Sequence, residues 1–120
     1  MKESDIDKIV QDKLMCIKFD DFDMLDFFEN EPVFVGEEEG GESIYSIKDR
    51  NSFTLILTTD IYAKKIDISI THENNTVFAG QFQNIFEIRK SEDVLLVEME
   101  GKKRLVIKKE PCLGVLMEDI

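Results

Sequence analysis

Histidine and cysteine, which supply many catalytic bases and metal ligands, are nearly missing from this chain of 120 residues. His72 is the one histidine, and it precedes Glu73 and two asparagines, a pattern typical of a solvent-facing turn. The spacing of Cys16 and Cys112 matches neither a redox motif nor a zinc site. We therefore expect two reduced thiols that behave as small apolar side chains.

The motifs of common enzyme classes are missing as well, since the sequence has no nucleophile-elbow, Walker or dinucleotide-binding fingerprint. Three glycines flank the run Glu37, Glu38 and Glu39, whose carboxylates would repel a phosphate. Carboxylates are abundant, but no two of them stand out as an acid and a base. Their order in this run also differs from that of an EF-hand calcium loop. We predict a protein that is not an enzyme, with no catalytic residues, no cofactor and no dedicated metal site.

Long apolar runs are also missing, since no stretch approaches the roughly 18 apolar residues that span a bilayer. The amino terminus lacks the apolar core and small-residue cleavage site of a signal peptide. With only two prolines and six glycines, the composition favours a compact globule over a chain rich in linkers. We expect a single domain over residues 1–120, located in the cytoplasm.

Positive charge is missing from one region. Residues 1–50 hold 15 acids against 6 bases, whereas residues 51–120 hold 11 acids against 9 bases. Between Lys18 and Lys48 there is no Lys, Arg or His, and the ten carboxylates there are Asp20, Asp21, Asp23, Asp26, Glu29, Glu31, Glu37, Glu38, Glu39 and Glu42. Such a surface repels nucleic acid and anionic membranes and attracts basic proteins.

An acidic run of this kind is often only a solvated face that keeps a protein soluble, and that interpretation stays open. Here, however, Phe22, Phe27, Phe28 and Phe34 are interleaved with the acids, unlike the aromatic-poor tracts of disordered segments. We expect the segment to fold and to display its carboxylates in fixed positions. A small basic cluster near Lys102 does not suffice for nucleic-acid binding in a chain of net charge −11.

The first 30 residues are predicted to be mostly helical. Ser4 is a candidate N-cap for a short helix, whose apolar face begins at Ile6. A second helix is expected from Asp20 to Glu29 and is ended by Pro32.

From Glu42 onward the apolar pattern has a period of two, which predicts strands. The expected strands cover residues 43–48, 52–59, 65–71, 76–79, 82–89, 94–99, 104–108 and 113–118. Connections of two to four residues join most of them, so the sheet is expected to be antiparallel. The predicted fold is α+β, mainly β. It has an antiparallel meander of about six to eight strands over residues 43–118, curled into a sandwich or half-barrel, with one or two amino-terminal helices.

Several features in this order resemble small immunity proteins of bacterial polymorphic and contact-dependent growth inhibition toxin systems. They are the Phe-Phe-x-x-x-Pro element (Phe27, Phe28, Pro32), Asn84 with Ile85 and Ile88, the strand from Leu95 to Glu98, the turn Gly101 to Arg104, and Pro111 before a last strand. The resemblance implies a cytoplasmic protein that binds and neutralises one cognate toxin domain. Such a toxin is often a nuclease and is then basic.

Under this hypothesis the partner is the carboxy-terminal domain of the toxin, with no nucleic acid and no membrane, and the protein is a monomer or a weak dimer. The interface would be a rim of acids with two exposed aromatic anchors, Phe34 and Tyr45. The rim comprises Asp20, Asp21, Asp23, Asp26, Glu29, Glu31, Glu37, Glu38, Glu39 and Glu42. Phe22 and Phe28 are expected in the core. The alternative is a β-sandwich or barrel that binds a small ligand or has a structural role.

Overall fold

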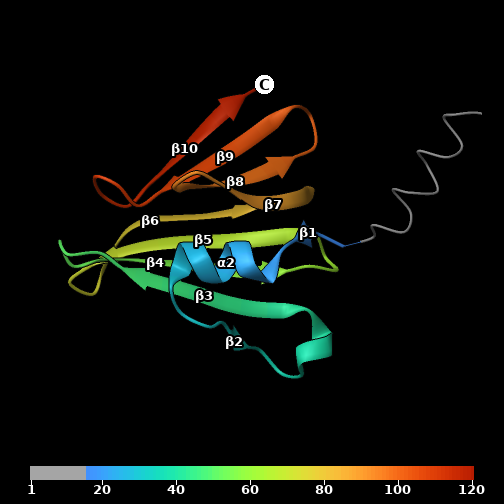
Figure 1. Ribbon diagram of the computed structural model, residues 1–120, viewed down its shortest axis with the longest axis horizontal. Helices are drawn as coiled ribbons and strands as arrows, with labels where there is room; N and C mark the ends of the chain where they lie inside the picture. Colours follow the sequence, from blue (N-terminus) through green and yellow to red (C-terminus); the bar gives the residue numbers. More distant parts are fainter. Residues whose placement is uncertain (1–15) are drawn as a thin grey trace, which may run out of the picture.

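The computed structural model describes residues 16–120, and its strands form two five-stranded sheets (Figure 1). The helix expected at Ser4 lies outside the described residues. In order of pairing, one sheet contains β1 (Lys18–Phe19), β7 (Ile85–Ser91), β8 (Val94–Met99), β9 (Lys103–Lys108) and β10 (Gly114–Asp119). The other contains β2 (Val33–Phe34), β3 (Glu42–Lys48), β4 (Phe53–Asp60), β5 (Lys65–His72) and β6 (Asn75–Phe82). The predicted fold class, mainly β with a helix, is confirmed.

Tight turns explain why most neighbouring strands are antiparallel. At the β5–β6 turn Glu73 and Asn74 both have positive φ angles, 49° and 71°, as a type I′ hairpin requires. At the β3–β4 turn one carboxylate oxygen of Asp49 accepts the N–H groups of Asn51 and Phe53, each at 2.9 Å. These connections leave no room for a crossover helix, as the sequence indicated.

One pairing is parallel, so the prediction of an entirely antiparallel sheet was wrong in one place. β1 pairs with β7, with Lys18 opposite Glu87 and Phe19 opposite Ile88. Neither β1 nor β2 was expected as a strand, because two residues are too few to display a period of two.

The strand expected over residues 82–89 is divided between the two sheets. Phe82 ends β6, and Ile85 begins β7 in the opposite sheet. Asn84 between them has a φ of 60°, and the N–H of Ile85 donates to the carbonyl oxygen of Lys64 at 3.0 Å. The chain therefore changes sheets here, which gives two layers in place of one curled sheet.

The core fills the space between the layers, and alternation selects its members. Ile66, Ile68 and Ile70 of β5 are buried, as their period of two predicted. From the other sheet Leu95 and Val97 of β8 are fully buried. The same hydrophobic cluster includes side chains of the helix.

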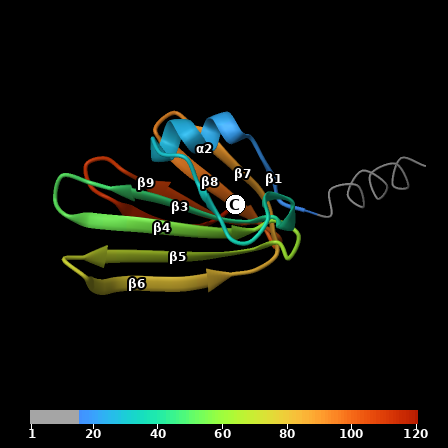
Figure 2. The ribbon, with the colours of Figure 1, turned by 90° about the horizontal axis from the view of Figure 1, so that it is seen from below.

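The helix α2 (Asp21–Phe28) closes one side of the sandwich, between β3 and β7 (Figures 1 and 2). Its N-cap is Asp20, whose side chain accepts the N–H of Phe22 at 2.8 Å. Met24, Phe27 and Phe28 point into the core. The ring of Phe28 stacks on Tyr45 of β3 at a centroid distance of 5.2 Å. The helix thus adds aromatic side chains to the core between the two sheets.

Two details of the expected helix were wrong. It ends at Phe28, and the C-cap is Glu29, whose backbone is left-handed (φ 58°) and whose N–H donates to the carbonyl oxygen of Leu25 at 2.8 Å, so Pro32 does not terminate the helix. Phe22 was expected in the core but is 81% exposed, because its position on the helix faces away from both sheets.

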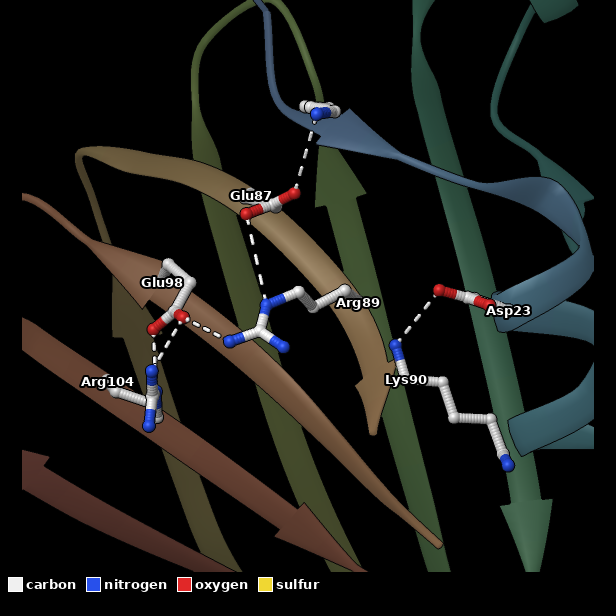
Figure 3. A network of polar contacts seen from close by, with 7 residues as sticks. Asp23, Glu87, Arg89, Lys90, Glu98 and Arg104 are labelled. Carbon is white, nitrogen blue, oxygen red and sulfur yellow. Dashed lines mark hydrogen bonds and ion pairs between the residues drawn. The ribbon is translucent and has the colours of Figure 1, made fainter. Parts of the chain in front are cut away.

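The outer face of the β1-containing sheet carries an ion network centred on Glu98, which is only 6% exposed (Figure 3). Arg104 donates to both of its oxygens, at 2.7 and 2.9 Å, and Arg89 donates at 3.0 Å. Arg89 lies 3.9 Å from Glu87, which in turn pairs with Lys18 of β1 at 3.8 Å. The network connects four neighbouring strands across the sheet.

A first prediction compares two phenylalanines of α2. Phe28→Ala is expected to lower the free energy of unfolding by about 3–5 kcal/mol, because it leaves a cavity next to Tyr45. Phe22→Ala is expected to change it by less than about 0.5 kcal/mol. Urea denaturation of both variants measures the difference. Equal losses would mean that α2 does not pack as described.

A second prediction concerns the Glu98 network. Hydrogen bonding from the Arg104 guanidinium holds the pKa of Glu98 below its usual value of 4.5, and Arg89 acts in the same direction. Because folding lowers this pKa, the stabilisation is complete above the unfolded-state pKa and is lost as the pH falls through the folded-state pKa.

Glu98→Gln should therefore lower the free energy of unfolding at neutral pH by about 2 kcal/mol. The difference in the free energy of unfolding between this variant and the unchanged protein should shrink below about pH 4. The matched control is Glu118→Gln. Glu118 is exposed and lies opposite Arg104 in the β9–β10 pairing. This variant should change the free energy of unfolding by less than about 0.5 kcal/mol. A pH-independent effect of Glu98→Gln would contradict the ionised network.

Candidate functional site

Three of the ten carboxylates attach α2 to the neighbouring sheet. Asp23 accepts the backbone N–H of Lys90 at 3.0 Å (Figure 3), and the Lys90 ammonium lies 3.0 Å from Asp26. The Lys109 ammonium lies 3.7 Å from Glu29. These acids therefore have partners within the chain, Asp23 and Asp26 at β7 and Glu29 at the carboxyl end of the helix.

Lys109 also stabilises the end of the helix. Its ammonium donates to the carbonyl oxygen of Phe27 at 2.7 Å and lies 4.8 Å from the centroid of the Phe27 ring. A cation at a helix carboxyl terminus complements the helix dipole. This lysine belongs to the small basic cluster of the sequence, and the structure gives it a role in holding α2.

The connection from β2 to β3 carries the Glu37–Glu39 run in a short 3-10 helix, η1 (Glu38–Gly40). Hydrogen bonds fix both ends of the connection. The N–H of Val35 donates to the carbonyl oxygen of Glu42 at 2.9 Å, and the N–H of Ile61 donates to that of Gly41 at 3.0 Å. The run therefore occupies a defined turn.

Gly41 is required at the end of this turn. Its φ is 80°, in the left-handed region, and a Cβ there would lie 2.6 Å from the ring of Tyr62. The close approach of the backbone to Tyr62 holds η1 near the start of α2 and β2. Any side chain at position 41 would push the turn outward.

A groove of about 460 Å³ lies between α2, β2, η1 and β3, and we name it the acidic groove. Its lining residues are Phe19, Asp21, Leu25, Glu31, Pro32, Phe34, Glu38, Gly41, Ser43, Tyr45 and Ile61. Three of these carry carboxylates and none carries a positive charge. The groove thus has an apolar floor, and the charged side chains in its walls are all carboxylates.

Tyr45 lies in the floor of the acidic groove, but its side chain is only 3% exposed. The prediction of an exposed Tyr45 anchor was therefore wrong. The reason is its stacking on Phe28, together with the alternation that also buries Ile47 of β3. Burial raises the pKa of the Tyr45 hydroxyl to about 12, and the Asp21 carboxylate adds to the effect.

The other predicted anchor, Phe34, is 43% exposed and lines the acidic groove. Further apolar side chains are exposed nearby, and we name them the apolar fringe: Phe22, Leu25, Val33 and Val35. Exposed apolar groups bordered by charges are typical of surfaces that bind another protein.

The ten acids do not form one continuous rim. Asp21, Glu31 and Glu38 meet around the acidic groove, whereas Asp23, Asp26 and Glu29 face Lys90 and Lys109. The other four lie at separate places. Asp20 caps α2, Glu37 and Glu39 flank Glu38 in the exposed turn, and Glu42 is half-buried in β3 opposite Asp60.

Sequence reasoning missed several lining residues of the acidic groove, among them Phe19, Ser43 and Ile61. Phe19 is placed by the parallel pairing of β1, and Ile61 by its backbone bond to Gly41. Neither contact leaves a periodic pattern in the sequence. The glycine after the Glu run was the available signal, because a glycine often ends a short helical turn.

Within residues 16–120 no group of three or more His, Cys, Asp or Glu side chains is arranged to hold a metal ion. No helix in this part of the chain is both long and apolar enough to cross a bilayer.

Comparison with known proteins gives a likeness in structure. No family model matches the sequence, and no curated protein matches it. A chain of the contact-dependent growth inhibition toxin–immunity protein complex from Klebsiella pneumoniae 342 has a similar fold, with a TM-score of 0.72 and 18% identity. The match covers 85% of this chain and 96% of that chain. The resemblance predicted from the sequence is confirmed at the level of the fold.

A third prediction tests the surroundings of Tyr45. Tyr62→Phe leaves Tyr45 as the only tyrosine, so the ultraviolet absorbance of the phenolate reports on this residue alone. We expect its pKa at about 12. Adding Asp21→Asn should lower the pKa but leave it above 10, because burial is the larger cause.

Because folding raises this pKa, the neutral hydroxyl stabilises the fold fully below the ordinary pKa of 10, and this stabilisation is lost as the pH rises toward about 12. The control, Asp67→Asn, removes an exposed carboxylate of β5 and should leave the titration unchanged. If Asp21→Asn also had no effect, Asp21 would not lie beside Tyr45.

Proposed function

We propose that this protein is an immunity protein that binds and neutralises the toxin domain of a contact-dependent growth inhibition system. The observation that carries the proposal is the fold shared with a chain of a toxin–immunity complex over most of both chains. The absence of sequence motifs for catalysis fits a binding protein that acts by occupying its target. It would act as a single domain in the cytoplasm.

We further propose that the toxin domain is basic and that the acidic half of this chain recognises it. Of the net charge of −11, the larger part lies in residues 1–50. A concentrated negative field speeds the encounter with a positive partner and gives specificity. A nuclease must bind a polyanion, so an acidic inhibitor is suited to occupy its substrate surface.

The binding surface combines charge with apolar contact. The apolar fringe and Phe34 supply exposed apolar area beside the acids. In protein interfaces such residues contribute most of the affinity when they become buried, and the surrounding charges orient the partner. One inhibitor would therefore occlude one toxin domain in a stoichiometric complex.

A fourth prediction neutralises five acids of this surface together: Asp21→Asn, Glu31→Gln, Glu37→Gln, Glu38→Gln and Glu39→Gln. Association with the cognate toxin domain should slow at least about tenfold at low salt. The difference should shrink at high salt, where the charges are screened. Stopped-flow mixing measures the rates, and survival of cells that co-express the pair measures protection.

The matched control changes the charge by the same amount away from this surface: Asp67→Asn, Glu73→Gln, Glu92→Gln, Asp93→Asn and Glu100→Gln. All five side chains are exposed. The control variant should associate nearly as fast as the unchanged protein. If both variants slowed association equally, net charge and not this surface would be responsible. Unchanged protection without any complex would rule out direct inhibition.

A further inference from the structure

The carboxylates of the acidic groove differ from those that attach the helix to the neighbouring sheet. Asp26 and Glu29 already have cationic partners at 3.0 and 3.7 Å, and Asp23 accepts the backbone N–H of Lys90. Asp21, Glu31 and Glu38 form no ion pair with any described residue, and they border a single hollow. Within residues 16–120 no ion pair compensates their negative charge.

We infer that the acidic groove receives an arginine side chain of the protein's partner. This inference rests on the proposed function and specifies the contact by which the toxin domain is recognised. Three carboxylates around one hollow favour a cation, and the apolar floor favours a cation with a long hydrocarbon stem. Both lysine and arginine meet this first requirement.

The aromatic lining distinguishes arginine from lysine. Phe34 is exposed in the groove and Phe19 lines it half-buried, while the ring of Tyr45 is buried in its floor. A planar guanidinium stacks on such rings and bonds a carboxylate through two parallel N–H groups, whereas a compact ammonium does neither as well. The combination of rings and carboxylates therefore fits a guanidinium.

The groove is also built in advance of binding. One wall, the η1 turn, is held by the Val35 and Ile61 backbone bonds, and the Ile17 N–H donates to the carbonyl oxygen of Ile61 at 2.9 Å. The opposite wall is α2, which is packed on the core. A preformed site loses little conformational entropy on binding, which favours a specific contact over a diffuse charge attraction.

The position of Tyr45 supports the same occupant. Its ring is stacked on Phe28, and Tyr45 lines the groove together with Asp21, whose charge acts on its hydroxyl. A neutral hydroxyl beside a carboxylate offers a hydrogen-bond acceptor to a donor-rich group. Arginine has five N–H donors and no acceptor, so it can use both.

The test uses short peptides as probes. Acetylated and amidated Ala-x-Ala peptides carry arginine, lysine or the uncharged analogue citrulline at x, and are titrated into the isotope-labelled full chain by NMR. We expect the arginine peptide to shift the amide signals of Phe34, Gly41 and Ser43. The lysine peptide should bind about threefold more weakly, and the citrulline peptide at least about tenfold more weakly.

Two variants with equal charge change separate the groove from its surroundings. Asp21→Asn with Glu38→Gln should weaken the arginine peptide about tenfold, because both carboxylates line the groove. Glu37→Gln with Glu39→Gln changes the same turn outside the lining and should have less than about a twofold effect. Phe34→Leu should remove most of the preference for arginine over lysine.

The outcomes also distinguish this inference from the proposed function. Equal losses in the two charge variants, or shifts spread over the whole acidic surface, would overturn the arginine site. If the toxin domain were still neutralised by the Asp21→Asn, Glu38→Gln variant with unchanged affinity, the site would be wrong and the immunity function would stand. If the peptide bound as expected but the toxin were not neutralised, the site would stand and the immunity function would be wrong.

Discussion

Two stacked sheets leave their sides open, and the structure depends on how α2 closes the side between β3 and β7. Met24, Phe27 and Phe28 enter the core there, and Phe28 stacks on Tyr45. This packing fixes the rotation of the helix about its axis. It thereby decides which carboxylates face β7 and which face the acidic groove, so the distribution of charge around the helix is set by a hydrophobic contact.

The second determinant is the unequal supply of cations around α2. Lys90 of β7 compensates Asp26, and Lys109 compensates Glu29 at the carboxyl end of the helix, while none of the described residues that line the groove is positive. Ion pairs within the described residues neutralise some of the carboxylates around α2 and leave those of the groove unpaired. An acidic segment without bases thus has one compensated part and one uncompensated part.

Periodicity located β3 to β5 and β8 to β10 within a residue or two, because burial of one face imposes a period of two. It failed for β1 and β2, which are too short, and at residues 83–84, where the chain changes sheets. The missing positive charge located the acids of the groove. The alternation of β3 was a signal for the burial of Tyr45, because Tyr45 and the apolar Ile47 share a face of this strand. The lining by Phe19 and Ile61 depends on contacts distant in sequence, which no local pattern encodes.

Nearly all of the groove lining lies between Phe19 and Tyr45, while most of the strands come from later residues. The lining of the groove and most of the β-sandwich therefore come from different parts of the sequence. Within the first stretch Met24, Phe27 and Phe28 belong to the core, whereas Phe34 and Glu38 are exposed. Substitutions at the exposed positions can therefore change the charge and shape of the groove while the two sheets and the packing of α2 stay the same.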